Sequence, residues 1–369
     1  MKVIILLLSS FFILLILSSC SDNGSNPVDT NKSLIRVPDD YPTIQLAIDA
    51  ANSNDSILVS PGRYIENINF KGKNIKVRST EGISNTVIDG DGKGSTVTFN
   101  SSESENAILD GFTIINGSKS GILCDSNSSP TLRNLRITSS RSSYGGGIGC
   151  LNSSSPSINS VTLIGNNAEY GGGIYCWNNS SPHLQNVRIT GNFATDGGGL
   201  SCSESSNPIL ESVLIVQNTA AYGGGVEILF NASPVFKNVT IADNTSILSL
   251  GGIYCNVSLD PILINTIVWN NPLSAIYFQT TNSPNSITVS YSNIEGGRSG
   301  IKDNNHGTVN WLDGNINYDP LFVDPENGDY HLQVGSPCID KGDSTSAFND
   351  YDGSRNDIGA YGGPFGNWS

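Results

Sequence analysis

Aromatic side chains recur at matching positions in the central part of the chain. Three tyrosines each stand just before a run of glycines, and Asp196 takes the fourth such place. The candidate stacking residues are Tyr144, Tyr170, Tyr175, Trp177, Tyr222 and Tyr254. Ring faces held on a rigid support can stack on sugar rings or anchor a protein partner. The alternative is that these rings shield turns and the edge of a sheet.

Aspartates crowd the C-terminal part of the chain. Asp350, Asp352 and Gly353 form a fragment of a calcium-loop pattern, and Asp357 follows closely. Carboxylate oxygens suit Ca²⁺, so the three aspartates are a candidate calcium site. The alternative is that they cap turns and pair with Arg355. No other cofactor is expected.

A catalytic set is harder to assemble. Enzymes that cleave polysaccharides use closely placed carboxyl groups, in some cases with Ca²⁺ and a basic group nearby. The positions expected to face outward in the central repeats contain no such carboxylate pair. Arg136 and Arg188 are the candidates for a lyase-type base, but an arginine without perturbing neighbours stays protonated. His183, His306 and His331 lie far apart in sequence, and we expect each to be solvated or hydrogen-bonded.

A fixed period must position these residues. Prolines stand 26 residues apart, and once 27 apart, at Pro130, Pro156, Pro182, Pro208, Pro234 and Pro261. Each is followed by strand-like alternation, as in Leu184, Val187 and Ile189, and glycine triplets recur with the same period. A leucine-rich repeat fits this half of the unit, but its other half needs a helix or an extended apolar segment, and glycine triplets break helices. The sequence therefore predicts an all-β, right-handed parallel β-helix solenoid over residues 34–318.

The period also predicts ladders of like residues, because equivalent positions stack on successive coils. An amide ladder is expected at a turn, from Asn166, Asn192, Asn218, Asn244 and Asn271. A thiol row is expected from Cys124, Cys150, Cys176, Cys202 and Cys255. Ile228 takes one place in that row, so the slot is apolar and disulfides are not favoured. A straight row also cannot surround a tetrahedral metal ion. Both ladders are interpreted as structural.

The two ends of the chain differ from the repeats. Residues 1–20 contain Lys2, an apolar run and the sequence LSSC, which resembles a bacterial lipobox with lipidation at Cys20. Residues 21–33 are polar and are expected to form a flexible tether. A short amphipathic capping helix is predicted from Ile44 to Ala51. Residues 319–369 are expected to form an irregular, Asp-rich C-terminal capping segment.

The charge balance limits the partners. The formal net charge is −14, and it becomes −15 without residues 1–19, whose only charged side chain is Lys2. Nucleic acid and anionic membrane surfaces are therefore poor partners: no nucleic acid is expected to bind, and the membrane is expected to be reached only through the N-terminal lipid. The same field repels acidic polysaccharides unless cations bridge them.

Several segments resemble known β-helix proteins. Residues 41–52 (YPTIQLAIDAAN), 59–67 (VSPGRYIEN) and 86–90 (TVIDG) are similar to the N-terminal part of pectin-lyase-like β-helix proteins. Residues 166–175 and 192–200 resemble repeats of chlamydial polymorphic outer-membrane proteins. Residues 319–361 resemble the closing segment of secreted or lipid-anchored bacterial β-helix proteins. The pectin methylesterase motif D-F-I-F-G and the polygalacturonase signatures N-T-D and G-H-G are absent, so these activities are not carried over.

These observations together predict a monomeric lipoprotein of the outer membrane or cell surface. Its expected function is to bind a polysaccharide or a surface protein, as an adhesion module without recognisable catalytic residues. The alternative function is that of a polysaccharide lyase or hydrolase of the pectin-lyase-like superfamily.

Overall fold

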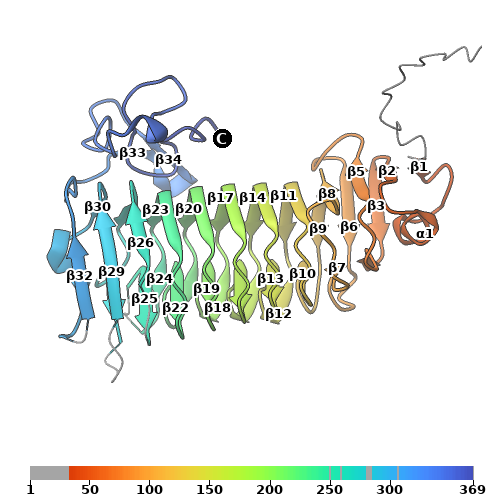
Figure 1. Cartoon of the computed structure of the whole chain (residues 1–369), viewed down its shortest axis with the longest axis horizontal. Helices are drawn as coiled ribbons and strands as arrows, with labels where there is room; N and C mark the ends of the chain where they lie inside the picture. The colour runs from red at the N-terminus through yellow and green to blue at the C-terminus, as the bar shows by residue number, and fades with distance from the viewer. Residues whose placement is uncertain (1–32, 249–250, 258–259, 280–284, 306, 369) are drawn as a thin grey trace, which may run out of the picture. The chain divides into compact units, whose positions relative to one another are not determined.

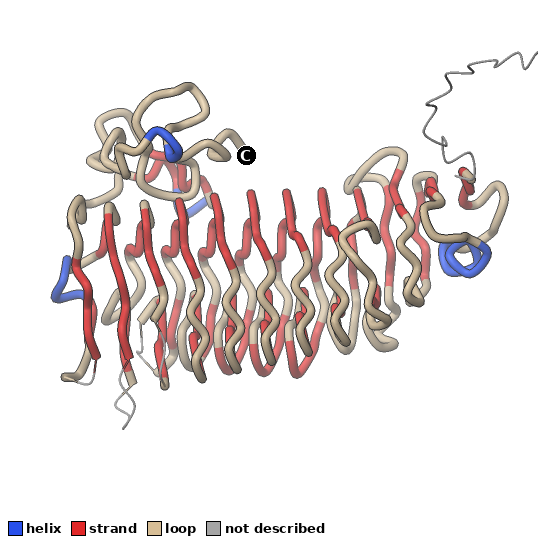
Figure 2. Tube along the Cα trace, viewed as in Figure 1, coloured by secondary structure: helices blue, strands red, loops and turns tan. Residues whose placement is uncertain are grey.

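The computed structural model describes residues 33–248, 251–257, 260–279, 285–305 and 307–368. Residues 33–369 form one compact unit, in which parallel strands coil around a common core. Figure 1 shows about ten coils side by side, and Figure 2 shows how loops join the strands of each coil. The expected all-β parallel solenoid is confirmed.

The largest sheet of the described residues, sheet A, supplies two strand segments to most coils. In the regular coils the two segments form one long bent strand, and elsewhere they are separate. Its strands are β1 (Leu34–Val37), β2 (Ser56–Val59), β3 (Gly62–Ile65), β5 (Lys76–Ser79), β6 (Thr86–Asp89), β8 (Ile108–Asp110), β9 (Thr113–Ile115), β11 (Thr131–Thr138), β14 (Ser157–Ile164), β17 (His183–Thr190), β20 (Ile209–Val216), β23 (Val235–Ala242), β26 (Ile262–Ile264), β27 (Ile267–Trp269), β29 (Asn285–Ser290), β30 (Asn293–Ile294) and β32 (Gly307–Trp311).

Two smaller sheets complete the coils. Sheet B contains β4 (Ile68–Asn69), β7 (Val97–Phe99), β10 (Ile122–Cys124), β13 (Ile148–Leu151), β16 (Ile174–Trp177), β19 (Leu200–Cys202), β22 (Val226–Leu229), β25 (Ile253–Asn256), β28 (Ile276–Phe278) and β31 (Ile301–Lys302). Sheet C lies in the turn between sheets A and B and contains β12 (Arg141–Tyr144), β15 (Asn167–Tyr170), β18 (Phe193–Asp196), β21 (Thr219–Ala220) and β24 (Thr245–Ser246). The short helix η1 (Gly297–Gly300) belongs to the last coils.

A single left-handed residue bends each long strand of sheet A. In β17 this residue is Asn186, with φ of 54°. It interrupts the alternation of side chains, so Leu184 and Val187 both point inward although they are three residues apart, and Ile189 follows in normal alternation. The same bend explains the recurring apolar spacing of three and then two residues. All three apolar side chains are fully buried, as the sequence predicted.

The predicted N-terminal helix is present as α1 (Ile44–Ala50), which contacts β1, β2 and β4. Thr43 caps its first turn by accepting a hydrogen bond from the Leu46 N–H at 3.2 Å. The Glu66 carboxylate accepts the N–H groups of Ile44 and Gln45, at 2.9 and 2.8 Å. The helix therefore buries its apolar side against the first coils, while a carboxylate satisfies its N-terminal donors.

The asparagines stack as an amide ladder inside the turn between sheet A and sheet C. The Asn166 N–H and side-chain amide both donate to the Asn192 Oδ1, at 2.9 and 3.1 Å. The same amide also donates to the Ile137 carbonyl at 3.0 Å. The pattern repeats through Asn218 and Asn244 to Asn271. Each side chain thus satisfies backbone groups that the turn would leave unpaired in the core.

A second ladder, made of serines, was not anticipated. The Ser128 N–H donates to the Ser154 hydroxyl oxygen at 3.0 Å, and Ser154 and Ser180 donate in the same way to the next serine, ending at Ser206. The ladder begins at Glu103, which accepts from the Ser128 hydroxyl at 2.7 Å. The serine hydroxyls thus accept hydrogen bonds from buried backbone N–H groups in the turn that leads from sheet B to sheet A.

The glycine triplets allow close contact between coils. A Cβ atom on Gly146 would lie 2.6 Å from the Gly172 carbonyl oxygen, and one on Gly172 would lie 2.5 Å from the Gly198 oxygen. Gly145 has φ of 70°, a conformation that disfavours other residues. A residue with a Cβ atom would therefore not fit in this turn unless the coils moved apart.

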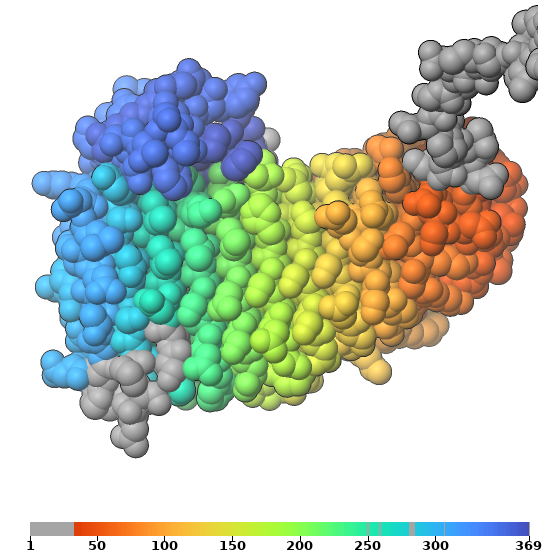
Figure 3. All heavy atoms as spheres, in the orientation of Figure 1, coloured from red at the N-terminus to blue at the C-terminus, as the bar shows by residue number. Residues whose placement is uncertain are grey.

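The C-terminal segment packs against the flank of the coils and does not simply close their end (Figure 3). It contains β33 (Phe322–Asp324), η2 (Pro325–Asn327), β34 (Asp329–Leu332) and η3 (Ser346–Phe348). Tyr330 packs with Leu214 and donates to Asp243 at 2.6 Å, and the Ala360 N–H donates to the Thr240 hydroxyl at 3.0 Å. Leu214 and Thr240, which occupy outward positions of the repeat, are therefore buried.

We predict that Val187→Asp destroys the cooperative unfolding transition. The substitution places a carboxylate among fully buried aliphatic side chains, which costs on the order of 4 kcal/mol or more. Thermal unfolding followed by circular dichroism measures this effect. Ser157→Asp, at an exposed position of β14, is the matched control and should unfold like the parent. A Val187→Asp protein with an unchanged melting curve would contradict the strand register.

Candidate functional site

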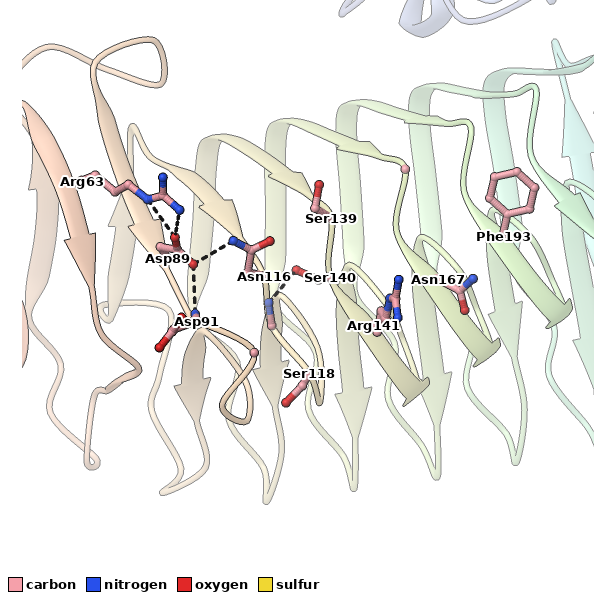
Figure 4. Close-up of a pocket in the computed structure, with 13 residues that line it drawn as sticks. Arg63, Asp89, Asp91, Asn116, Ser118, Ser139, Ser140, Arg141, Asn167 and Phe193 are labelled. Atoms are coloured by element: carbon pink, nitrogen blue, oxygen red, sulfur yellow. Dashed lines mark hydrogen bonds and ion pairs between the residues drawn. The ribbon is translucent and has the colours of Figure 1, made fainter.

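A groove of about 740 Å³ crosses successive coils where sheet A turns into sheet C. Figure 4 shows side chains from neighbouring coils along it. Its lining residues are Arg63, Asp89, Asp91, Gly92, Asn116, Gly117, Ser118, Ser139, Ser140, Arg141, Gly165, Asn167 and Phe193. Guanidinium, amide and hydroxyl groups dominate this lining, with one aromatic ring at one end.

The coil register builds half of the groove from one row of residues. Arg141 pairs with Asn167 in sheet C, and Asn167 pairs with Phe193. Each residue begins its strand and is exposed to solvent, and Phe193 exposes 52% of its surface. Parallel strands lie about 4.8 Å apart, so a cation, an amide and a ring follow one another within about 10 Å.

An ion-paired cluster forms the other half of the groove. Asp89 at the end of β6 accepts hydrogen bonds from the Arg63 guanidinium, the Asn116 amide at 2.9 Å and the Asp91 N–H at 2.9 Å. Burial alone would raise the pKa of Asp89, but the hydrogen bonds from Asp91, Asn116 and Arg63 outweigh burial and lower it. Asp89 is therefore ionised and holds Arg63 and Asn116 in place.

The two arginines of the groove differ in their pairing. Arg63 is paired with Asp89 but still exposes 60% of its side chain. Arg141 has no ion-pair partner among the described residues. Asp91 pairs with Lys93 at 2.7 Å. The groove thus presents guanidinium groups to a ligand, although the chain as a whole is acidic.

The candidate tyrosines lie outside this groove, in two stacked clusters. Tyr144 stacks on Tyr170 and Tyr175, with ring centroids 5.7 and 5.5 Å apart. Tyr222 packs on Tyr254, and Tyr254 stacks on Tyr277, at 5.4 and 6.2 Å.

Not all of these aromatic residues can contact a ligand. Tyr175 and Tyr254 expose only 6% and 5% of their surface, so they pack within the turn. Tyr144 and Trp177 are exposed, and Tyr170 and Tyr222 are partly exposed. The expectation of six accessible stacking rings is therefore wrong for Tyr175 and Tyr254.

The candidate calcium residues already accept hydrogen bonds from their own segment. Asp350 accepts the N–H groups of Asp357 and Gly363, and Asp352 accepts that of Ser354. Asp357 accepts the Asp340 N–H at 2.7 Å, and burial together with the neighbouring acids raises its pKa to about 6. No group of three or more metal-ligating side chains is arranged for an ion within the described ranges. The calcium hypothesis stays a prediction.

The basic candidates for catalysis do not meet in the groove. The Arg188 guanidinium donates to the Gly328 carbonyl at 2.7 Å, beneath the C-terminal segment. Arg136 is exposed on β11. His183 pairs with Glu211 at 3.0 Å and His331 with Asp329 at 2.7 Å. His306 lies outside the described residues.

The cysteine row lies inside the core. Cys124, Cys150, Cys176 and Cys202 are register partners on successive coils, and Ile228 and Cys255 continue the row. All five are free and buried, as is Cys338. Burial raises the pKa of Cys124 and Cys176 well above the ordinary value. A hydrogen bond to Cys176, and then burial, does the same for Cys150. These thiols therefore pack as small apolar groups.

The lipidation candidate Cys20 lies outside the described residues. Among the residues that are described, no helix has the length and apolar character to cross a membrane.

Comparison with known proteins supports the architecture. Residues 95–245 match the family model described as the right handed beta helix region. No curated protein matches the chain. Among solved structures, the pectate lyase Pel9A is similar with a TM-score of 0.54 and 13% sequence identity, over 86% of this chain and 90% of that chain.

At this identity the structural likeness concerns the fold alone. It leaves the resemblance to chlamydial outer-membrane repeats and to lipoproteins as a prediction. The strand register, the family-model match and the likeness to Pel9A together identify the fold as a right-handed parallel β-helix.

Proposed function

We propose that the protein binds a polysaccharide that carries acidic groups, along the groove at the turn between sheets A and C. The observation that carries this proposal is the exposed row of Arg141, Asn167 and Phe193, in register on successive coils. A chain of sugar rings is an extended ligand with a repeating unit, and this row is an extended surface with a repeating spacing. Binding of this kind is common to an adhesion module and to an enzyme of the same fold.

The side chains of the groove suit the parts of such a ligand. An exposed ring can stack on the apolar face of a sugar, and amides and hydroxyls can bond its hydroxyl groups. The Arg141 guanidinium, which has no ion-pair partner among the described residues, can pair with a carboxylate. The overall charge of −14 opposes an acidic ligand. The arginines offset that field locally, which makes them the decisive groups.

Cleavage of the bound chain is the second candidate function. The likeness to a pectate lyase fold favours it, and pectate is therefore the first ligand to test. Within the groove, however, Asp89 is ionised and hydrogen-bonded to three partners, and Asp91 is paired with Lys93. Neither carboxylate is free to act as a base, so binding without cleavage is the primary proposal. A surface protein as ligand remains the other partner that we expected.

Binding to polygalacturonate measured by isothermal titration calorimetry tests this function. We expect saturable binding, weakened about tenfold by Arg141→Ala and by Phe193→Ala, because each removes an exposed side chain of the row that contacts the ligand. Thr219→Ala is the matched control: Thr219 is the next residue of the same row but does not line the groove, so binding should not change. Equal affinity of all four proteins would contradict the proposed site.

The same samples distinguish binding from cleavage. They are incubated with polygalacturonate with and without Ca²⁺, and unsaturated ends are followed by ultraviolet absorption and new reducing ends by a colorimetric assay. Saturable binding without product supports a binding module, whereas unsaturated ends identify a lyase and reducing ends alone a hydrolase. Tighter binding or product formation that requires Ca²⁺ and is lost in Asp350→Asn would support the calcium hypothesis.

We further propose that lipidation at Cys20 holds the protein at the outer membrane or cell surface. The support is the apolar run that ends in LSSC, followed by a polar segment. We predict that Cys20→Ser shifts the full-length protein, expressed in a bacterium, from the membrane fraction to the soluble fraction and abolishes incorporation of labelled palmitate. Ser25→Ala, in the same segment, should leave both properties unchanged. Labelled palmitate in Cys20→Ser would exclude this cysteine as the anchor.

A further inference from the structure

The tyrosine rows are interrupted on two successive coils, by Asp196 in sheet C and by Ser201 and Glu227 in sheet B. In sheet C, Tyr144, Tyr170, Asp196 and Tyr222 occupy equivalent positions on successive coils. In sheet B, the equivalent row is Tyr175, Ser201, Glu227 and Tyr254. Aromatic contacts join the two sheets on either side of the interruption. Within this interruption, one carboxyl group from each sheet takes the place of a ring, and Ser201 takes a third place.

Glu227 is buried there without a cation. It exposes 2% of its surface, and its Oε2 accepts a hydrogen bond from the Ser201 hydroxyl at 2.8 Å. The titratable groups that act on it or on Asp196 are acids and tyrosines: Asp196, Glu169, Tyr170, Tyr175 and Tyr254. No described lysine, arginine or histidine is paired with either carboxyl. An ionised Glu227 would thus be a buried and uncompensated charge.

The electrostatics follow from this environment. Burial, and then the charge of Asp196, raises the pKa of Glu227 to about 8, against a smaller lowering by Ser201. Burial, and then Glu169, raises the pKa of Asp196. Glu227 therefore retains its proton in the folded turn at a pH where a solvated glutamate, with a pKa of about 4.3, has lost it.

Sheet C connects this pair to the groove. Asp196 is the last residue of β18, and Phe193, which lines the groove, is the first. In the neighbouring strand β15, Asn167 and Tyr170 have the same relation. The strands that carry the groove row are therefore held against sheet B at their other ends by the tyrosine contacts, and the Asp196 and Glu227 carboxyl groups act on each other electrostatically beside those contacts.

We propose that Asp196 and Glu227 form a pH-sensitive clasp, which holds sheet C against sheet B while protonated and loosens sheet C when it loses protons. The clasp regulates the groove, because a loosened sheet C no longer keeps Asn167 and Phe193 in register with Arg141. This second statement rests on the proposed function, whereas the clasp itself does not.

The direction of the effect is set by proton linkage. In the closed clasp Glu227 retains its proton. In the opened clasp Glu227 is solvated and loses this proton above the ordinary pKa of a glutamate. The population of the opened turn therefore rises about tenfold per pH unit from about pH 5, and levels off above the folded pKa of Glu227, near pH 8. Acid conditions close the clasp.

Hydrogen exchange of the full-length protein, read by mass spectrometry of peptides from β15 and β18, tests the clasp. The reporting amides are Gly171, which donates to the Asp196 carbonyl at 2.8 Å, and Gly197, which donates to the Tyr222 carbonyl at 3.0 Å. After correction for the intrinsic exchange rate, we expect their protection to fall about tenfold per pH unit between pH 5 and pH 8. Amides of β14, which lies in the core sheet, should show no such slope.

Variants separate the clasp from general alkaline destabilisation. Glu227→Gln keeps the shape of the side chain but cannot titrate, and it should flatten most of the pH slope. Asp196→Asn, at a half-buried position, should reduce the pH slope. It should also lower the pH at which the slope levels off, because the charge of Asp196 no longer raises the pKa of Glu227. Glu204→Gln, an exposed glutamate on the same coil, should behave like the parent. A parent slope of zero, or an unchanged slope in both Glu227→Gln and Asp196→Asn, would overturn the proposal.

A binding measurement separates the clasp from the proposed function. If both are correct, polygalacturonate binds the parent more weakly at pH 8.5 than at pH 6, while Glu227→Gln retains its affinity at both values. If nothing binds at either pH but the exchange slope is present, the clasp stands and the polysaccharide proposal fails. If binding is found and is equal at both pH values in the parent, the regulatory statement is wrong.

Discussion

Backbone hydrogen bonding between successive coils is the constraint on which the structure depends. Because each coil pairs in register with the next, a residue always lies on its equivalent from the preceding turn. At inward positions, side chains of the same kind must therefore stack on one another. Aliphatic side chains and thiols do so by apolar packing, and amides do so by hydrogen bonding. The asparagine and serine ladders solve the same problem at two turns, where buried donors would otherwise lack partners.

The outward positions are free of this demand, and there the chain departs from its own repeat. Arg141, Asn167 and Phe193 share one row but belong to three chemical classes. Asp196 stands in a row of tyrosines. Both departures fall on sheet C, the short sheet in the turn, whose strands have two to four residues. A turn sheet of this size is a suitable place for binding and for local opening, because the core sheets remain intact when it moves.

The C-terminal segment and the groove lie on different parts of the coil surface. The segment covers Leu214, Thr240 and Asn238, and the carbonyl of its Gly328 accepts a hydrogen bond from the half-buried Arg188. The groove lies at the turn between sheets A and C, from Arg63 in the first coils to Phe193 on the coil of Arg188. The acidic side chains of the segment are occupied by its own backbone N–H groups. The segment also buries apolar side chains of β20, β23 and β27.

The sequence by itself determined the period, the inward rows, the capping helix and the positions of the ladders, because these follow from repetition and from local alternation of side chains. Only the tertiary structure decided which outward residues meet. Arg63 reaches Asp89 across 26 residues in the irregular first coils, where no period could be read, and Arg188 meets Gly328 across 140 residues. Asp196 and Glu227 come from sheets C and B, so the spacing within one row does not predict that their carboxyl groups act on each other. The repeat period predicts contacts within one row, because equivalent residues stack. Contacts between rows depend on the backbone geometry of the turn, which the period does not predict.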